Sequence, residues 1–192
     1  MKTALIDNQD SFTYNIVDLA GKIPENELSV IPYDGISTDE LEDFDNLILS
    51  PGPGLPDEFP LLQDVLKKYH TSKSFLGICL GHEAIAKFFG AELLHLPSVV
   101  HGQPKVINVV KESAFYRNVP ERFKAGLYHS WVIDKDKFPA DLEITGLSDE
   151  GNIMSFQHKT LNLFGVQFHP ESIITEYGKE MMENFLKTGN TV

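Results

Sequence analysis

The chain has a single cysteine, Cys79, among its 192 residues, so no disulfide can form within it. Absence of disulfides is typical of a reducing compartment, and we therefore expect a cytoplasmic location. The segment 1–7 carries only a short apolar run before acidic side chains begin, so no secretory signal peptide is expected.

Basic residues are also scarce. Lys and Arg number 16 against 28 Asp and Glu, which leaves a formal net charge of −12. Binding to nucleic-acid phosphates requires clustered Lys and Arg, so no nucleic-acid partner is expected. No apolar run approaches the roughly 20 residues that a membrane-spanning helix needs, so no membrane partner is expected either. The seven histidines lack metal-ligand spacing, and we expect neither a metal nor another cofactor.

The apolar content, in contrast, is ordinary at 42%, and the length suits one domain covering residues 1–192. In the first half, short apolar runs alternate with segments of helical periodicity. Strands are predicted at 4–6, 28–32, 46–49 and 74–78, and helices at 11–20, 38–44 and 61–69. Asp10 or Ser11 is the expected cap of the first helix. Strands separated by helices indicate a parallel sheet covered on both faces.

The second half has a different pattern, with strand-like runs that are less regularly separated by helices. Strands are predicted at 106–110, 125–131, 142–145, 153–158 and 163–167, with a hairpin turn at 149–152 and a final helix at 173–186. The sequence therefore predicts an α/β fold. It has an open, mostly parallel central sheet, helices on both faces and an antiparallel section in the C-terminal half.

Cys79 lies between Gly77 and Gly81, after a predicted strand and before a predicted helix. This is the arrangement of a nucleophile elbow, in which glycines stand where side chains would clash. The helix N-terminus beneath such a thiol favours the thiolate. Most free cysteines are buried structural residues, however, so Cys79 alone leaves both interpretations open.

A second group of polar residues follows the last predicted strand. His169 ends the strand, and Glu171 stands two residues further on, where a carboxylate can reach the second ring nitrogen. A histidine oriented in this way is the base of a nucleophilic triad. A turn-rich segment at 50–54 follows another strand, and ligands of open α/β sheets bind at this end of the strands.

Several motifs occur in a fixed order along the chain: 7–15 (DNQDSFTYN), 50–54 (SPGPG), 77–82 (GICLGH), 128–130 (YHS) and 165–171 (GVQFHPE). With them the chain resembles the class I (triad) glutamine amidotransferase family along nearly its whole length. The resemblance is best to the small amidotransferase subunits of anthranilate synthase and aminodeoxychorismate (para-aminobenzoate) synthase. It implies the family's three-layer, flavodoxin-like fold.

The resemblance also implies roles for residues. Cys79 attacks the side-chain amide of L-glutamine, His169 protonates the departing ammonia, and Glu171 orients His169. Backbone N–H groups of Leu80 and of Gly52 or Gly54 form the oxyanion hole. The full set of implied substrate contacts is Gly52, Pro53, Gly54, Leu80, Glu83, Ser130 and Trp131. Of the other histidines, His70, His95 and His158 are interpreted as surface residues, and His82 and His129 as structural ones.

The implied partner is the large subunit of a chorismate-using synthase, which would receive the ammonia. The sequence barely separates the aminodeoxychorismate branch, which we favour slightly, from the anthranilate branch. Two alternatives stay open: an amidotransferase that serves another acceptor synthetase, and a non-catalytic subunit that binds glutamine as a scaffold.

Two positions depart from the family pattern. The family usually has Gln where this chain has Glu83, and the synthase subunits often have Lys where it has Gln103. A carboxylate at 83 cannot donate to the substrate's carboxylate, and its charge raises the pKa of a nearby thiol. Gln103 leaves the partner's identity less certain.

The Glu83→Gln variant should therefore bind glutamine more tightly than the natural chain, because an amide can both donate and accept. The apparent KM for glutamine is the measurement. A KM that does not fall would refute this account of Glu83.

Overall fold

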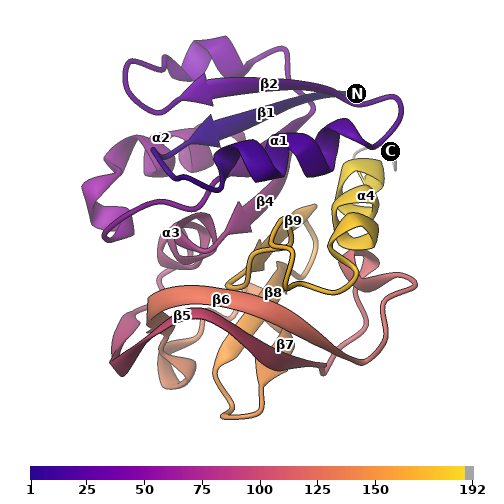
Figure 1. Ribbon diagram of the computed structural model, residues 1–192. Coiled ribbons are helices and arrows are strands. Elements are labelled where there is room, and N and C mark those ends of the chain that lie inside the picture. The colour runs from indigo at the N-terminus through magenta and orange to yellow at the C-terminus, as the bar shows by residue number, and fades with distance from the viewer. Residues whose placement is uncertain (189–192) are drawn as a thin grey trace.

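The computed structural model describes residues 1–188, except for the side chains of residues 98–100. One nine-stranded sheet runs through the described part of the chain (Figure 1). Its strands, in spatial order, are β2 (Glu27–Pro32), β1 (Lys2–Asp7), β3 (Asn46–Leu49), β4 (Ser74–Ile78), β9 (Leu163–Val166), β8 (Ile153–His158), β7 (Leu142–Ser148), β5 (Leu93–Val109) and β6 (Arg122–Ile133).

The sheet changes character at β9. From β2 to β9 every neighbouring pair is parallel, and from β9 to β6 every pair is antiparallel. The turn at 149–152 joins β7 to β8 as the sequence predicted. The predicted α/β fold, with its antiparallel section in the C-terminal half, is confirmed.

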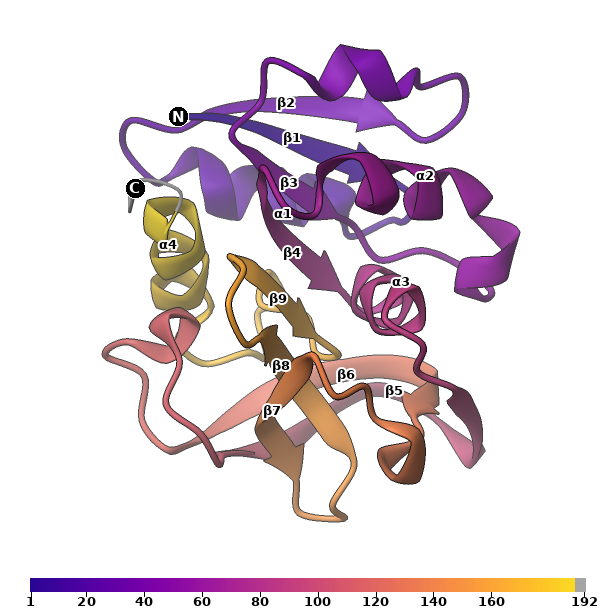
Figure 2. The same ribbon diagram turned by 180° about the vertical axis from the view of Figure 1, so that it is seen from behind.

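Two helices cover each face of the parallel part (Figures 1 and 2). α1 (Thr13–Gly21) and α4 (Gly178–Thr188) lie on one face, and α2 (Pro60–Tyr69) and α3 (Leu80–Phe88) lie on the other. Short 3-10 turns complete the elements: η1 (Thr38–Leu41), η2 (Pro56–Glu58), η3 (Ala114–Tyr116) and η4 (Lys135–Lys137).

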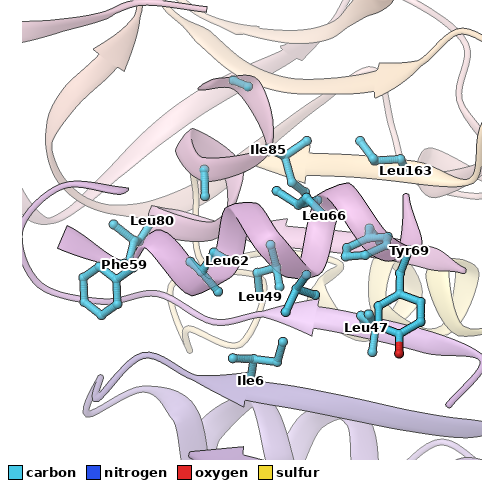
Figure 3. Close-up of a cluster of buried hydrophobic side chains, with 14 of the residues drawn as sticks. Ile6, Leu47, Leu49, Phe59, Leu62, Leu66, Tyr69, Leu80, Ile85 and Leu163 are labelled. Atoms are coloured by element: carbon cyan, nitrogen blue, oxygen red, sulfur yellow. The ribbon is translucent and has the colours of Figure 1, made fainter. Parts of the chain in front are cut away.

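Strand β3 shows why the core forms two layers. Leu47 and Leu49 pack against α2 and α3, while Ile48 between them packs on the side of α1 and α4, because successive side chains of a strand point to opposite faces. All three are fully buried, and each such side chain contributes about 1.5–3 kcal/mol. Figure 3 shows the buried side chains of the layer on the side of α2 and α3, where Leu62 and Leu66 of α2 meet Leu49 of β3.

Some boundaries differ from the sequence prediction. The final helix begins at Gly178 rather than at residue 173, because residues 170–177 form turns instead. In these turns the Ser172 N–H donates to the carbonyl of His169 (3.1 Å), and Ile173 is fully exposed. Helix α1 begins at Thr13, so neither Asp10 nor Ser11 caps it; the expected cap was wrong. The helix predicted at 38–44 is the single 3-10 turn η1.

The largest difference is the length of the β5–β6 ribbon. The sequence predicted strands at 106–110 and 125–131, whereas β5 has 17 residues and β6 has 12. Prolines within 93–105 hide the strand from a propensity argument, and the pairing shifts register around them. Among the helices of residues 1–188, none is long and apolar enough to cross a membrane.

Helix α3 approaches β3 and β4 very closely, and two glycines allow it. A Cβ atom on Gly81 would lie 2.3 Å from the carbonyl oxygen of Leu49, and one on Gly77 would lie 2.4 Å from the carbonyl of Gly81. Both obstacles are backbone atoms, which cannot move aside as a flexible side chain can. The close approach places the start of α3 directly against the ends of two central strands.

Gly81→Ala should therefore destabilise the protein by about 1–3 kcal/mol, the usual cost of overpacking a core. Gly21→Ala is the matched control, because a Cβ there meets nothing within 4 Å. The control should be neutral or slightly stabilising, since alanine lowers the entropy of the unfolded chain. Urea unfolding measures both, and equal stabilities of the two variants would contradict the packing argument.

Candidate active site

Cys79 occupies a strained turn between β4 and α3. Its backbone N–H donates to the carbonyl of Val166 (2.9 Å), which is the last residue of β9 and already pairs with β4. Its φ of 51° and ψ of −103° are unusual for a side chain larger than glycine. Such strain is typical of functional turns, and here it places the thiol at the carboxyl edge of the parallel sheet.

His169 and Glu171 form a buried pair just after β9. The ring Nδ1 lies 2.7 Å from Glu171 Oε1, and the two side chains are 2% and 0% exposed. An ionised carboxylate only accepts, so Nδ1 carries the proton and Nε2 is left as the acceptor. Nε2 has no hydrogen-bond partner among the described residues. The pair thus presents Nε2 as an unpaired basic nitrogen, on a ring that the Glu171 carboxylate holds at Nδ1.

Two aromatic rings hold the imidazole in place. Phe12 lies 5.1 Å from the His169 ring and Tyr128 lies 4.9 Å from it, measured between ring centroids. Phe12 and Tyr128 also contact each other at 4.9 Å. The ring of His169 is therefore packed on its sides as well as hydrogen-bonded at Nδ1.

A cavity of about 350 Å³ lies in front of Cys79. Its lining includes every substrate contact that the sequence analysis named: Gly52, Pro53, Gly54, Leu80, Glu83, Ser130 and Trp131. His169 and Glu171 stand outside this lining, and Glu171 instead borders a neighbouring hollow of about 460 Å³. A larger hollow of about 940 Å³ between β5 and η3 includes none of these residues. In residues 1–188 no cluster of acidic, His or Cys side chains is arranged to hold a metal ion.

The surroundings of the Cys79 thiol favour its protonated form. Burial raises its pKa well above the usual value, and the charges of Glu83, Asp10 and Glu171 raise it further. The Leu80 N–H lowers it, as expected at a helix N-terminus, but burial outweighs that effect. The expected effect of the helix N-terminus, which favours the thiolate, and the expected direction of the Glu83 effect are both confirmed, but burial has the larger influence on the pKa of the thiol. A thiol in this state needs a base to become nucleophilic.

Glu83 is itself almost completely buried, at 3% exposure. Burial raises its pKa to about 8, while a hydrogen bond from Gln167 works in the opposite direction. At neutral pH most molecules therefore carry a neutral carboxylic acid at this position. Such a group keeps one O–H donor, so Glu83 can donate to a substrate carboxylate after all. This corrects the sequence argument, which assumed a carboxylate, so the lower KM expected for Glu83→Gln applies above about pH 8, where Glu83 is ionised.

Sequence reasoning named Gln167 within a motif but assigned it no role. Its side-chain Nε2 lies 3.1 Å from Glu83 Oε1 and 3.8 Å from Cys79 Sγ, so it links the two. His95 also lines the cavity, with its ring 4.8 Å from that of Trp131. Neither contact has a sequence signal, because each joins residues that are more than 30 positions apart in the chain.

Two further histidines lie close to the site. His129 borders the cavity, its Nδ1 lies 2.7 Å from the carbonyl of Trp131, and burial lowers its pKa. His82 is fully buried, and its pKa falls to about 3 for the same reason. Both rings are therefore neutral, which fits the structural role that the sequence analysis gave them.

The raised pKa of Glu83 makes stability depend on pH. The unfolded group ionises near 4.5 and the folded group near 8, so its contribution is complete below pH 4.5 and is lost as the pH rises to about 8. Each unit of difference between the two pKa values corresponds to about 1.4 kcal/mol. Glu83→Gln, which cannot ionise, should gain stability relative to the natural chain between pH 5 and pH 8.

Urea unfolding at both pH values tests this, with the exposed Glu180→Gln as the matched control. A stability difference between Glu83→Gln and the natural chain that does not change with pH would mean that Glu83 is already ionised in the folded protein.

Comparison with known proteins agrees with this geometry. Residues 4–188 match the family described as glutamine amidotransferase class-I. Aminodeoxychorismate/anthranilate synthase component 2 of Bacillus subtilis is 39% identical, over 96% of this chain and 95% of its own length. Anthranilate synthase component 2 of Pseudomonas aeruginosa is 37% identical, over 95% of this chain and 94% of its own length.

A solved structure shows the same fold. The crystal structure of a glutamine amidotransferase from Thermotoga maritima matches with a TM-score of 0.75, covering 98% of this chain and 97% of that one. At 17% identity that likeness concerns the fold alone. The family match covers nearly the whole chain, and the cavity is lined by residues from the motifs at 50–54, 77–82 and 128–130. The chain belongs to the class I glutamine amidotransferase family.

Proposed function

We propose that this chain is the glutamine-hydrolysing subunit of a chorismate-using synthase, and that it works through a Cys79–His169–Glu171 triad. The observation that carries the proposal is the buried His169–Glu171 pair: its Nε2 is unpaired, and its imidazole packs on Tyr128, which lines the cavity together with Cys79. A nucleophile, a base and the carboxylate that orients the base are the parts needed for acyl transfer.

In the first step the sulfur of Cys79 attacks the side-chain carbonyl carbon of L-glutamine. The thiol proton passes to Nε2 of His169, and Glu171 stabilises the imidazolium that forms. Because burial raises the pKa of the thiol, transfer of its proton to His169 during attack is more accessible than a standing thiolate. The negative charge of the tetrahedral intermediate is held by the N–H of Leu80 and that of Gly52 or Gly54.

In the second step the C–N bond breaks and His169 returns the proton to the leaving nitrogen, which departs as ammonia. The remaining γ-glutamyl thioester on Cys79 is attacked by water, with His169 again removing a proton. Cleavage of the C–S bond then releases glutamate and restores the thiol. No metal or other cofactor takes part in this scheme.

Substrate recognition would come from the polar rim of the cavity. Ser130 and Trp131 lie on β6, where main-chain groups can meet the amino-acid end of glutamine. Glu83 in its neutral form can donate to the substrate carboxylate, and in its ionised form it can accept from the ammonium group. Pro53 closes the loop side of the cavity.

The partner is proposed from the relatives. Those from Bacillus subtilis and Pseudomonas aeruginosa are each named component 2 of a synthase, and such a name implies a component 1. The large subunit would convert chorismate with the ammonia released here. The first name covers both aminodeoxychorismate and anthranilate, so either branch, or both, fits this chain. The single, unpaired cysteine supports a cytoplasmic setting.

A non-catalytic glutamine-binding scaffold is the second candidate, and Glu83 is the observation that favours it. A glutamine analogue that alkylates thiols separates the two: an enzyme is labelled at Cys79 in the presence of the large subunit, whereas a scaffold is not. Because the chain has one cysteine, the labelled site is unambiguous.

The decisive experiment uses the complex with the co-purified large subunit and chorismate. Glutamine should support product formation by the natural chain, and Cys79→Ser should abolish it. Added ammonium salt should support product formation by both, because it bypasses the thiol. The product, anthranilate or aminodeoxychorismate, identifies the branch. Glutamine-supported turnover by Cys79→Ser that equals that of the natural chain would refute the triad.

A further inference from the structure

Within the motif at residues 7–15, only Phe12, which packs on His169, and Asp10, whose charge raises the pKa of Cys79, have a part in the site described above. Some of its members serve local structure: Asp7 Oδ1 accepts from the hydroxyl of Thr13 (2.7 Å), and Asp10 Oδ1 accepts from the N–H of Phe12 (2.7 Å). These bonds shape the turn between β1 and α1. Asn8 is different, because its side chain is directed across the sheet edge to another loop.

Asn8 is fully buried and makes two hydrogen bonds to one residue of that loop. Its side-chain Nδ2 donates to the carbonyl of Ser50 (2.9 Å), and its backbone N–H donates to the hydroxyl oxygen of Ser50 (2.9 Å). The same hydroxyl donates onward to the carbonyl of Pro51 (2.7 Å). The carbonyl of Ser50 is thus fixed by Asn8, and the carbonyl of Pro51 is fixed by the hydroxyl of Ser50.

The next residue of the loop packs directly on Asn8. A Cβ on Gly52 would lie 2.9 Å from Asn8 Cβ and 2.4 Å from Leu80 Cδ2, so the bare backbone passes between these two side chains. The side-chain amide of Asn8 thus contributes the Nδ2 donor and packing against Gly52. Its Oδ1 acceptor has no partner among the described residues, which costs stability.

The composition of the loop explains why it needs an external support. Pro51 and Pro53 have no N–H, so Gly52 and Gly54 are the residues whose N–H groups can face the cavity. The ends of the loop are held by Ser50 N–H to the carbonyl of Ile6 (3.1 Å) and by Leu55 N–H to Glu58 Oε1 (2.8 Å). Asn8 supports the part between, next to the cavity.

We propose that Asn8 is a positioning residue for the oxyanion hole, acting through Ser50 to hold the peptide N–H groups of the 52–54 segment towards the reacting carbonyl. The inference rests on the proposed function of this segment as an oxyanion hole. Donors of this kind are effective because they are already oriented when charge develops, and loss of one costs about 10²–10³ in rate. Loosening their support has a smaller effect of the same kind.

The test compares two reactions of Cys79 in the isolated chain. Iodoacetamide alkylates the thiol by direct displacement of iodide, which creates no oxyanion. p-Nitrophenyl acetate acylates the thiol through a tetrahedral oxyanion and releases p-nitrophenolate. The ratio of the acylation rate to the alkylation rate therefore reports the oxyanion hole separately from the state of the thiol. Acylation of a Cys79→Ser chain is subtracted as background.

Asn8→Leu removes the donor while keeping a similar shape, and it should lower the ratio about 10-fold, below the 10²–10³ for a lost donor. Alkylation should stay within about twofold. Asn46→Leu is the matched control: Asn46 is equally buried and donates to Thr3 Oγ1 (3.3 Å), but it stands at the opposite end of β3. It should lower stability and leave the ratio unchanged.

Ser50→Ala is the second variant, which decides the question if Asn8→Leu does not fold. It removes the hydroxyl that accepts from Asn8 and donates to Pro51, so it should lower the same ratio. An unchanged ratio in the folded variant would overturn the proposal. So would an equal fall of both rates, since that result indicates general damage to the fold around Cys79.

Failure of the proposed function is recognised separately. p-Nitrophenyl acetate needs neither glutamine nor the large subunit, so the ratio is informative even if the complex never turns over glutamine. If the complex does turn over glutamine, Asn8→Leu should lower kcat with little change in KM, because the substrate contacts at Glu83, Ser130 and Trp131 remain.

Discussion

The contact between the start of α3 and the central strands is the constraint on which this site depends. Gly77 and Gly81 let backbone meet backbone, and Leu49 lies against the same turn of helix. A helix that begins so close to the sheet leaves no room for a relaxed connection, and Cys79 therefore takes a positive φ. The same approach brings Leu80 against Gly52, so the elbow and the loop beside it form one packed unit.

The chemistry of the site follows from its burial. Taking the thiol out of water raises the pKa of Cys79, and carboxyl groups around it add to the effect. The same burial keeps Glu83 neutral up to about pH 8, which limits its repulsion of a thiolate at neutral pH. The His169–Glu171 pair complements this thiol, because a carboxylate 2.7 Å from Nδ1 fixes the orientation of the imidazole ring. The arrangement suits proton transfer during attack rather than a resting thiolate.

Much of the fold was predictable because local pattern and tertiary environment agreed. β3, β4 and β8 have the predicted bounds, since each is a short strand-like run bounded by turn-forming segments. Prediction failed where a tertiary contact overrides local propensity. The β5–β6 ribbon crosses prolines, and the turns after His169 displace a helix that the periodicity favoured. In both cases pairing with a distant segment decides the backbone, and no window of sequence contains that information.

The sequence by itself determined which groups are proposed as reactive. Glycines around Cys79, the His169–Glu171 spacing and the motif order depend on covalent neighbours, and these are present in the linear chain. Only the tertiary structure decided how the groups behave. The protonation of Glu83 depends on its burial. The contacts of Gln167 with Glu83 and Cys79, and the hydrogen bond from Asn8 to Ser50, join residues more than 40 positions apart. Desolvation and hydrogen bonding depend on what surrounds a group in space, which folding supplies.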